Sequence, residues 1–216
     1  MKRWIDILLD LFLAVVGLAL LWIFAQIFLF ASMEPELVEG DFVVVWKPML
    51  GARLFNLNMT LRLEQVEIHR VPGFRNIKRD DVLVFNFPYP NNWDRIEMHI
   101  LKYYVKRCIG LPGDTLFIKK GRFRVEGIDE PLGNIKSQQK IGQTLPEEFP
   151  GGVYRCFPYD SIIGWNIQNF GPLYIPKTGD RLPMNLKNYQ LYHKLISWEQ
   201  KAKLEYKDST VFLNDK

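Results

Sequence analysis

The chain has 216 residues, of which 48% are hydrophobic, 14% aromatic and 24% charged. This length is sufficient for one apolar N-terminal segment and one domain with its own core. The net charge of +4 arises from 28 basic and 24 acidic residues that are mixed along the chain. Because no block of clustered Lys and Arg occurs, nucleic acid is not an expected partner.

The N-terminal part contains a long apolar run, LFLAVVGLALLWIFAQIFLFA, at residues 11–31. As a helix rising about 1.5 Å per residue, this run would match the roughly 30 Å hydrocarbon layer of a bilayer. Lys2 and Arg3 precede it and acidic residues follow it, so the positive-inside rule predicts a cytoplasmic N-terminus at residues 1–10 and an extracytoplasmic domain at 32–216. The run is too long for a removable signal peptide and lacks the small-residue pair that cleavage prefers. The sequence therefore predicts a single-pass anchor in the cytoplasmic membrane, with the lipid bilayer as a partner and a periplasmic or extracellular domain.

The domain after the anchor carries mainly strand signals. β-branched runs closed by Pro or Gly predict strands near residues 42–47, 79–88 and 100–114. The runs TLFIKK and FRVEG on either side of Gly121 predict a hairpin. Residues 48–78 have no clean period and predict an insertion with some apolar surface, which either packs on the domain or rests on the bilayer.

A second insertion is predicted at roughly residues 120–205. Within it, Leu191, Leu195 and Trp198 have helical spacing and predict one amphipathic helix over 185–201. The last stretch, KLEYKDSTVFLNDK, predicts a strand, a turn and a second strand. The predicted fold class is therefore mainly β, with a single N-terminal transmembrane helix and a small helical insert.

The cysteines and histidines show no metal-ligand pattern. Cys108 and Cys156 are too far apart for a CxxC motif, and three histidines, His69, His99 and His193, lack ligand spacing. We therefore predict neither a metal nor another cofactor. One disulfide and two partly buried free thiols are both compatible with the cysteine positions.

Ser32 follows the apolar run directly. Pro35 disfavours continuation of a helix through this point, so Ser32 is expected on a bent segment at the membrane boundary. Most serines at such positions are caps or solvated turns. A nucleophilic serine also requires a base within hydrogen-bond reach, and no histidine here lies in a triad context.

Lys106 is the alternative base. A lysine serves as a base near neutral pH only when desolvation lowers its pKa. In the predicted strand YYVKRCIG, alternation places Tyr104, Lys106 and Cys108 on one face and Val105 on the other. The competing interpretation is an edge-strand lysine whose ammonium group extends to water.

Four segments in order, SMEPEL, GDFVVVWK, KRDDVLVF and YYVKRCIGLPGD, together with the apolar N-terminus, resemble the type I signal peptidases. These are membrane-anchored Ser/Lys endopeptidases that remove signal peptides from exported preproteins. The resemblance covers residues 1–114. It implies Ser32 as nucleophile and source of an oxyanion-binding backbone N–H, Lys106 as general base, and Met33 as a residue of the substrate groove. It implies structural roles near the site for Pro35, Gly110, Pro112, Gly113 and Asp114.

The implied reaction needs no cofactor. Neutral Lys106 would take the proton from the Ser32 hydroxyl, and the serine oxygen would attack the carbonyl that follows a small residue of the preprotein. Water activated by the same lysine would hydrolyse the acyl-enzyme. Cys108 is a minor alternative nucleophile.

Three departures from the family pattern bear on activity. Glu36 stands where members have a small residue, and Phe30 stands where many have an oxyanion-binding serine. The late Gly179-Asp180 lacks the Ser and Asp-Ser-Arg that should follow. We therefore expect either missing C-terminal strands or a site completed by another chain. Other functions left open are a catalytically incomplete, membrane-anchored protein that binds peptides or a partner, and an envelope-assembly protein.

Overall fold

The computed structural model describes residues 2–30, 33, 36–38, 40–56, 59, 68–89, 91–97, 99, 102–208 and 210–214. The chain divides into two compact units, each assembled from separate stretches of the sequence. Unit 1 comprises Met1–Ile77, Val84–Asn86 and Ile100–Lys106, and unit 2 comprises Lys78–Leu83, Phe87–His99 and Arg107–Lys216.

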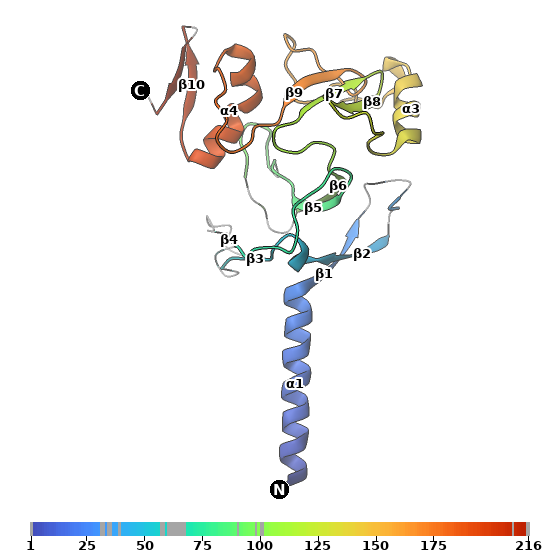
Figure 1. Cartoon of the computed structure of the whole chain (residues 1–216), viewed down its shortest axis with the longest axis vertical. Coiled ribbons are helices and arrows are strands. Elements are labelled where there is room, and N and C mark those ends of the chain that lie inside the picture. The colour runs from blue at the N-terminus through green and yellow to red at the C-terminus, as the bar shows by residue number, and fades with distance from the viewer. Residues whose placement is uncertain are drawn as a thin grey trace. The chain divides into compact units, whose positions relative to one another are not determined.

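Unit 1 begins with a long helix, followed by short antiparallel strand pairs (Figure 1). Its elements are α1 (Lys2–Phe24), β1 (Ala25–Phe30), β2 (Asp41–Trp46), the 3-10 helix η1 (Lys47–Met49), β3 (Arg53–Leu54) and β4 (His69–Arg70). β1 pairs with β2 from Ala25 opposite Trp46 to Phe30 opposite Asp41. β3 pairs with β4, with Arg53 opposite Arg70.

The predicted anchor at residues 11–31 is wrong in its bounds. The helix ends at Phe24, and the residues that follow it form β1 rather than further helical turns. The physical reason is non-local: the aromatic and β-branched residues of AQIFLF favour a strand, and β2 supplies the backbone partners. None of the helices formed by the described residues is both long enough and apolar enough to cross a membrane.

A two-stranded sheet of β5 (Val82–Asn86) and β6 (Tyr103–Arg107) is divided between the units. Residues 84–86 and 103–106 of these strands belong to unit 1. In β6, Val105 is completely buried, whereas Tyr104 and Lys106 on either side of it are exposed. The alternation predicted from the sequence is therefore confirmed within this strand.

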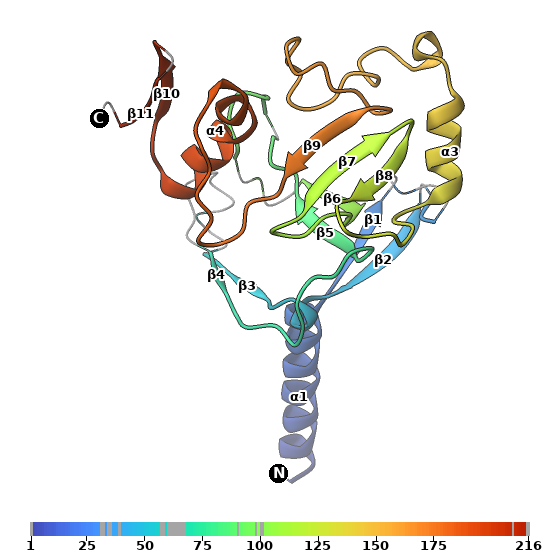
Figure 2. The same ribbon diagram turned by 45° about the horizontal axis from the view of Figure 1, so that its top comes forward.

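Unit 2 is organised around a three-stranded sheet in the order β8-β7-β9 (Figure 2). Its elements are β7 (Thr115–Lys119), β8 (Arg122–Val125), α3 (Ile135–Gln143), the 3-10 helix η2 (Pro146–Glu148), β9 (Phe170–Tyr174), α4 (Leu186–Gln200), β10 (Leu204–Lys207) and β11 (Thr210–Leu213). β7 and β8 form the hairpin predicted around Gly121, and β10 pairs with β11 as the predicted C-terminal strand pair. The prediction of a mainly β fold is confirmed.

The sequence analysis missed α3. Asn134 caps this helix by accepting a hydrogen bond from the Ser137 N–H. Gln138, the buried residue of the helix, joins it to the sheet region: its side-chain oxygen accepts from the Phe123 N–H and its amide donates to the Leu132 carbonyl. Because its buried residue is polar, few apolar residues mark the inner face of this short helix, and the sequence analysis overlooked it.

The predicted helix at 185–201 corresponds to α4, which Asn185 caps. Leu191 and Tyr192 are buried, and the Tyr192 hydroxyl donates to the carbonyl of Tyr174 at the end of β9. The predicted apolar face is only partly correct, since Leu195 and Trp198 remain exposed.

Candidate active site

Lys106 lies near the end of β6, beside the fully buried Val105. Its ammonium nitrogen is 5.8 Å from the centroid of the Tyr104 ring, a distance at which a cation is attracted to an aromatic face. Desolvation lowers the pKa of Lys106 below its ordinary value. The side chain as a whole is nevertheless exposed, so the lowered pKa reflects partial loss of water around the ammonium group and not enclosure. A lowered pKa increases the neutral fraction that proton abstraction requires.

Ser32 and Pro35 lie outside the described residues. The structure therefore gives no distance between the Ser32 hydroxyl and Lys106. The described neighbour of Ser32 is Met33, which is half-buried. The Met33 carbonyl accepts hydrogen bonds from the N–H groups of Glu36 at 2.9 Å and Leu37 at 3.1 Å. The chain therefore makes a tight turn here, between the end of β1 and the start of β2.

The segment from Gly110 to Asp114 lies in unit 2 and forms a braced turn. The Asp114 carboxylate accepts the Leu111 N–H at 2.8 Å within this turn. Gly113 has φ +96°, a conformation that favours glycine, and its N–H donates to the Ile175 carbonyl at 2.7 Å. In return, the Ile175 N–H donates to the Asp114 carbonyl at 2.8 Å. The turn is thus fixed to the residue that follows β9.

Arg79 stabilises this turn, although the sequence analysis assigned it no role. Its guanidinium donates to both carboxylate oxygens of Asp114, at 2.9 and 2.5 Å. The hydrogen bond from Arg79 holds the pKa of Asp114 below its ordinary value. The segment KRDDVLVF was recognised as a motif, but its pairing with a residue 35 positions later depends on the fold.

Asp80 links the same region to the chain before α3. Its carboxylate accepts the Gly133 N–H at 2.8 Å, and its backbone N–H donates to the Cys108 carbonyl at 2.7 Å. Arg107 donates in turn to the Asp80 carbonyl at 2.8 Å. Asp80 therefore joins the residues that directly follow Lys106 to the rest of unit 2.

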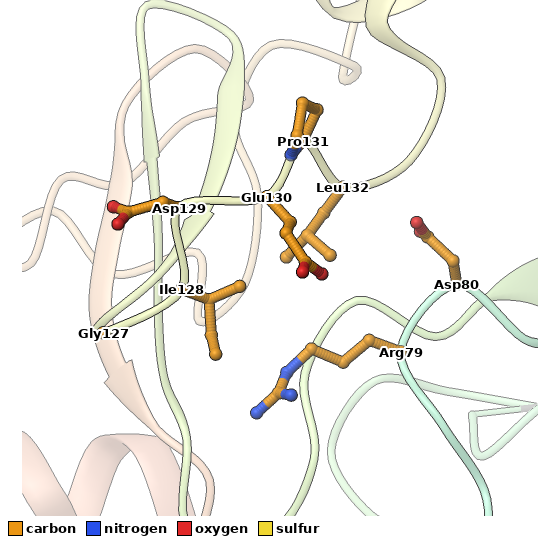
Figure 3. A pocket seen from close by; sticks show the side chains of 8 residues that line it. All are labelled: Arg79, Asp80, Gly127, Ile128, Asp129, Glu130, Pro131 and Leu132. Atoms are coloured by element: carbon orange, nitrogen blue, oxygen red, sulfur yellow. The ribbon is translucent and has the colours of Figure 1, made fainter.

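A hollow of about 380 Å³ lies next to these residues, and Figure 3 shows the side chains that line it. Its lining consists of Arg79, Asp80 and the run from Gly127 to Leu132. Lys106 is not among these lining residues, so we do not assign the candidate active site to this hollow. Within the described part of the chain, no group of three or more acidic, histidine or cysteine side chains is placed to hold a metal ion.

Cys108 and Cys156 are free thiols, so the disulfide alternative is not the one found. Burial raises the pKa of the Cys108 thiol, and the charges of Asp81 and Asp114 add to this effect. Burial also raises the pKa of Cys156 to about 11. Because the thiolate is the reactive form, these shifts disfavour Cys108 as a nucleophile near neutral pH.

Comparison with known proteins identifies the class. A family model described as "Signal peptidase, peptidase S26" matches residues 1–164, most of the 216 residues, and the chain belongs to this family. The chain is also similar to "Signal peptidase I" of Pseudomonas aeruginosa (strain PAO1), with 33% identity over 124 residues. That alignment covers 52% of this chain and 37% of the relative, so the chain spans well under half of the relative's length. No solved structure matches the chain.

Proposed function

We propose that this protein is a membrane-attached serine endopeptidase that cleaves signal peptides from exported preproteins, with Ser32 as nucleophile and Lys106 as general base. The observation that carries the proposal is the match of residues 1–164, which include both Ser32 and Lys106, to the signal peptidase family. The desolvation that lowers the pKa of Lys106 on β6 supports the role of this lysine, because a lysine base must be neutral to accept a proton.

The chemistry follows from this assignment. Neutral Lys106 accepts the proton of the Ser32 hydroxyl as the oxygen attacks the scissile carbonyl, and the backbone N–H of Ser32 donates to the developing oxyanion. The protonated lysine then supplies the proton to the leaving amine. In the second half of the reaction, the same amine takes a proton from the water that releases the acyl group.

Substrate binding would use backbone contacts. The preprotein would lie extended beside the site strands, with Met33 lining the groove and small pockets accepting alanine-like side chains. The tight turn at Met33 supports this proposal, because two hydrogen bonds to its carbonyl fix the residue next to the nucleophile.

Membrane attachment through α1 is the second part of the proposal. The described side chains of α1 include large apolar groups that are exposed over most of its circumference, among them Leu8, Leu9, Leu11 and Leu13, whereas Asp10 interrupts them on the remaining side. A helix with so wide an apolar surface is normally covered by protein or by lipid. Attachment to the membrane would place the peptidase where preproteins emerge.

The test is cleavage of a preprotein with an Ala-x-Ala site by the full chain in membranes. Wild type should cleave, Ser32→Ala and Lys106→Ala should each lose nearly all activity, and Lys102→Ala should retain it. Lys102 is a matched control because it is an exposed lysine four positions before the proposed base. Equal cleavage by wild type and Lys106→Ala would refute the dyad.

A binding-only role is the second candidate, and the exposure of the Lys106 side chain is the observation that favours it. The presence of Phe30 also favours this candidate, because a phenylalanine side chain cannot donate a hydrogen bond to an oxyanion. This candidate predicts that wild type and Ser32→Ala bind a signal peptide equally and that neither cleaves it.

A further inference from the structure

The chain that follows β9 lies against the turn that precedes β7. Where the pairing of β7 with β9 ends, Thr115 is opposite Tyr174. The residues beyond this pair continue the backbone contact, because the Ile175 N–H donates to the Asp114 carbonyl at 2.8 Å and the Gly113 N–H donates to the Ile175 carbonyl at 2.7 Å. All of these residues belong to unit 2, in which Figure 2 shows β9 alongside β7. The sheet therefore holds the turn through Ile175.

The Ile175 side chain occupies the space beside Gly110. A Cβ at Gly110 would lie 2.4 Å from the Cδ1 of Ile175 and 3.8 Å from its Cγ1. Gly110, unlike Gly113, does not have a left-handed φ, so its backbone conformation does not require glycine. The close packing of Ile175 does require it, because even the methyl group of alanine would have to displace the isoleucine.

The other glycine of the turn has a looser contact. A Cβ at Gly113 would lie 3.3 Å from the Cδ of Lys177. The Lys177 side chain is exposed and can rotate away, whereas Ile175 is half-buried and branched at its Cβ. The contact between Ile175 and Gly110 is therefore the one that restricts the position of the turn.

Ile175 is itself held by contacts that do not involve the turn. The Asp180 carboxylate accepts the Lys177 N–H at 2.9 Å and the Tyr174 hydroxyl at 2.5 Å, which closes the loop at residues 175–180. The hydroxyl of Tyr192, a buried residue of α4, donates to the Tyr174 carbonyl at 2.8 Å. β9, α4 and Asp180 thus give Ile175 a fixed position from which it can support the turn.

The chain between Lys106 and the turn is fixed at each residue. The Arg107 side chain donates to the Asp80 carbonyl at 2.8 Å, and the Asp80 N–H donates to the Cys108 carbonyl at 2.7 Å. The Cys108 thiol donates to the Gly110 carbonyl at 3.3 Å. Because Lys106 is bonded directly to Arg107, no slack segment lies between the lysine and Gly110 that could absorb a shift of the turn.

We propose that Ile175 is a positioning residue for peptide cleavage: its contact with Gly110 fixes the turn and, through residues 107–110, the orientation of the Lys106 side chain. The inference rests on the proposed function of Lys106 as general base. It gives a role in the reaction to the chain after β9, within the insertion at residues 120–205, to which the sequence assigned none.

Removal of one methyl group tests the contact. Ile175→Val deletes the Cδ1 that lies beside Gly110 and keeps the rest of the side chain. Cleavage of the Ala-x-Ala preprotein is measured with the full chain in membranes, and the folded fraction is measured by resistance to brief proteolysis. We expect kcat per folded molecule to fall about tenfold, because a small displacement of a reacting group is costly. KM should change by less than about twofold, since the proposed substrate groove at Met33 is not altered.

The reciprocal change tests the same contact from the other side. The methyl group of Gly110→Ala would overlap Ile175, so this variant should lose more activity than Ile175→Val. In the double variant Gly110→Ala/Ile175→Val, the added Cβ takes the space that the deleted Cδ1 leaves. Its kcat per folded molecule should therefore be at least about threefold higher than that of Gly110→Ala alone.

Gly121→Ala is the control for a general loss of stability. Gly121 follows the opposite end of β7, where a Cβ would lie 2.7 Å from the Gln138 carbonyl oxygen of α3. This variant should lower the folded fraction and leave kcat per folded molecule unchanged, because it does not touch the turn.

The outcomes separate the inference from the proposed function. If Ile175→Val keeps the wild-type kcat per folded molecule, or if the double variant is no better than Gly110→Ala, the inference is overturned. The Ser/Lys assignment then stands as long as Lys106→Ala is inactive. If Lys106→Ala cleaves like wild type, the proposed function and the inference are overturned together.

Discussion

Lys106 combines two properties that usually exclude each other. Its side chain is exposed, yet desolvation by its surroundings lowers its pKa. Val105 of β6 is completely buried, and the strand alternation directs Lys106 to the other face, where Tyr104 is its aromatic neighbour. A bound peptide that covers this face would remove more water and lower the pKa of Lys106 further.

This geometry predicts the pH dependence of cleavage. Because the pKa of Lys106 is lowered from its ordinary value of 10.5, the neutral amine accumulates at lower pH than in a free lysine. A plot of kcat/KM against pH should therefore rise with pH along one limb whose midpoint lies below 10.5. Ser32→Ala, measured with the same preprotein, supplies the background. A rising limb centred at or above the ordinary lysine value would contradict the role of Lys106 as a desolvated base.

Arg79 and Asp114 provide a stability test. Their side chains retain only 28% and 12% of their accessible surface, so the pair is intermediate between an exposed and a buried ion pair. Arg79→Ala should lower the free energy of unfolding by about 1 to 2 kcal/mol. A double-mutant cycle with Asp114→Ala, measured by urea unfolding, isolates the coupling between the two side chains. Additive losses would show that the two groups do not stabilise each other.

The contribution of this ion pair to the stability of the fold changes with pH in a defined direction. The folded-state pKa of Asp114 is lower than the ordinary value of 3.8, so its carboxylate stabilises the fold above that value. This contribution falls as the pH drops below 3.8 and is lost once the pH passes below the folded-state pKa. Wild type should therefore lose more stability than Asp114→Asn between neutral pH and strong acid.

At the scale of elements, the β7–β8 hairpin and α3 depend on each other. Gly121 turns the hairpin with φ +75°, and a Cβ at this position would lie 2.6 Å from the Gly142 backbone nitrogen and 2.7 Å from the Gln138 carbonyl oxygen. The turn therefore packs directly on the backbone of α3. Neither contact can be relieved by rotating a side chain.

Gly121→Ala should destabilise unit 2 by about 2 to 4 kcal/mol, through left-handed strain together with this overlap. Gly127→Ala is the matched control, because Gly127 has φ +74° but nothing within 4 Å of an added Cβ. The control should lose only about 1 to 2 kcal/mol, the cost of the backbone conformation. Thermal unfolding of the two variants compares them directly, and equal losses would mean that α3 moves away at no cost.

These elements also show what the sequence could predict. The Gly121 hairpin and α4 were predicted because turn chemistry and helical spacing are local signals. β1 was missed because its strand conformation depends on pairing with β2, eleven or more residues away. α3 was missed because it is short and its buried residue is the polar Gln138, so few apolar residues mark its inner face.

The candidate site also combines features that local sequence patterns predict with features that depend on the fold. The environment of Lys106 could be anticipated from strand alternation, which is local to YYVKR. The ion pair of Arg79 with Asp114 joins two motifs 35 residues apart, and no pattern within either motif predicts it. The roles of Ser32, Lys106, Met33 and the oxyanion N–H remain predictions, because Ser32 lies outside the described residues.

For the molecule as a whole, α1 is notable because its described side chains leave a large apolar surface exposed. Leu8 and Phe12 are four residues apart, hence on one face, and each is 63% exposed. Ile7 and Leu13, on other sides of the helix, are also more than half exposed, whereas Asp10 interrupts the apolar surface. Under the proposed membrane attachment, lipid acyl chains would cover these side chains, because they surround a helix without preference for one side.

Replacing Leu8 and Phe12 together by lysine should therefore release the protein from membranes. Each lysine costs up to about 3 kcal/mol in an apolar lipid environment, so the share of the full chain that stays in the membrane fraction after a carbonate wash should fall at least tenfold. Ile162→Lys, at an equally apolar exposed position of unit 2, should leave that share unchanged. If the double variant remained membrane-bound like wild type, α1 would not be the attachment element, and its apolar surface would have to be covered by several protein partners. In that case the cleavage assay would still test the Ser32 and Lys106 assignment, since the chemistry requires only that a preprotein reach β6.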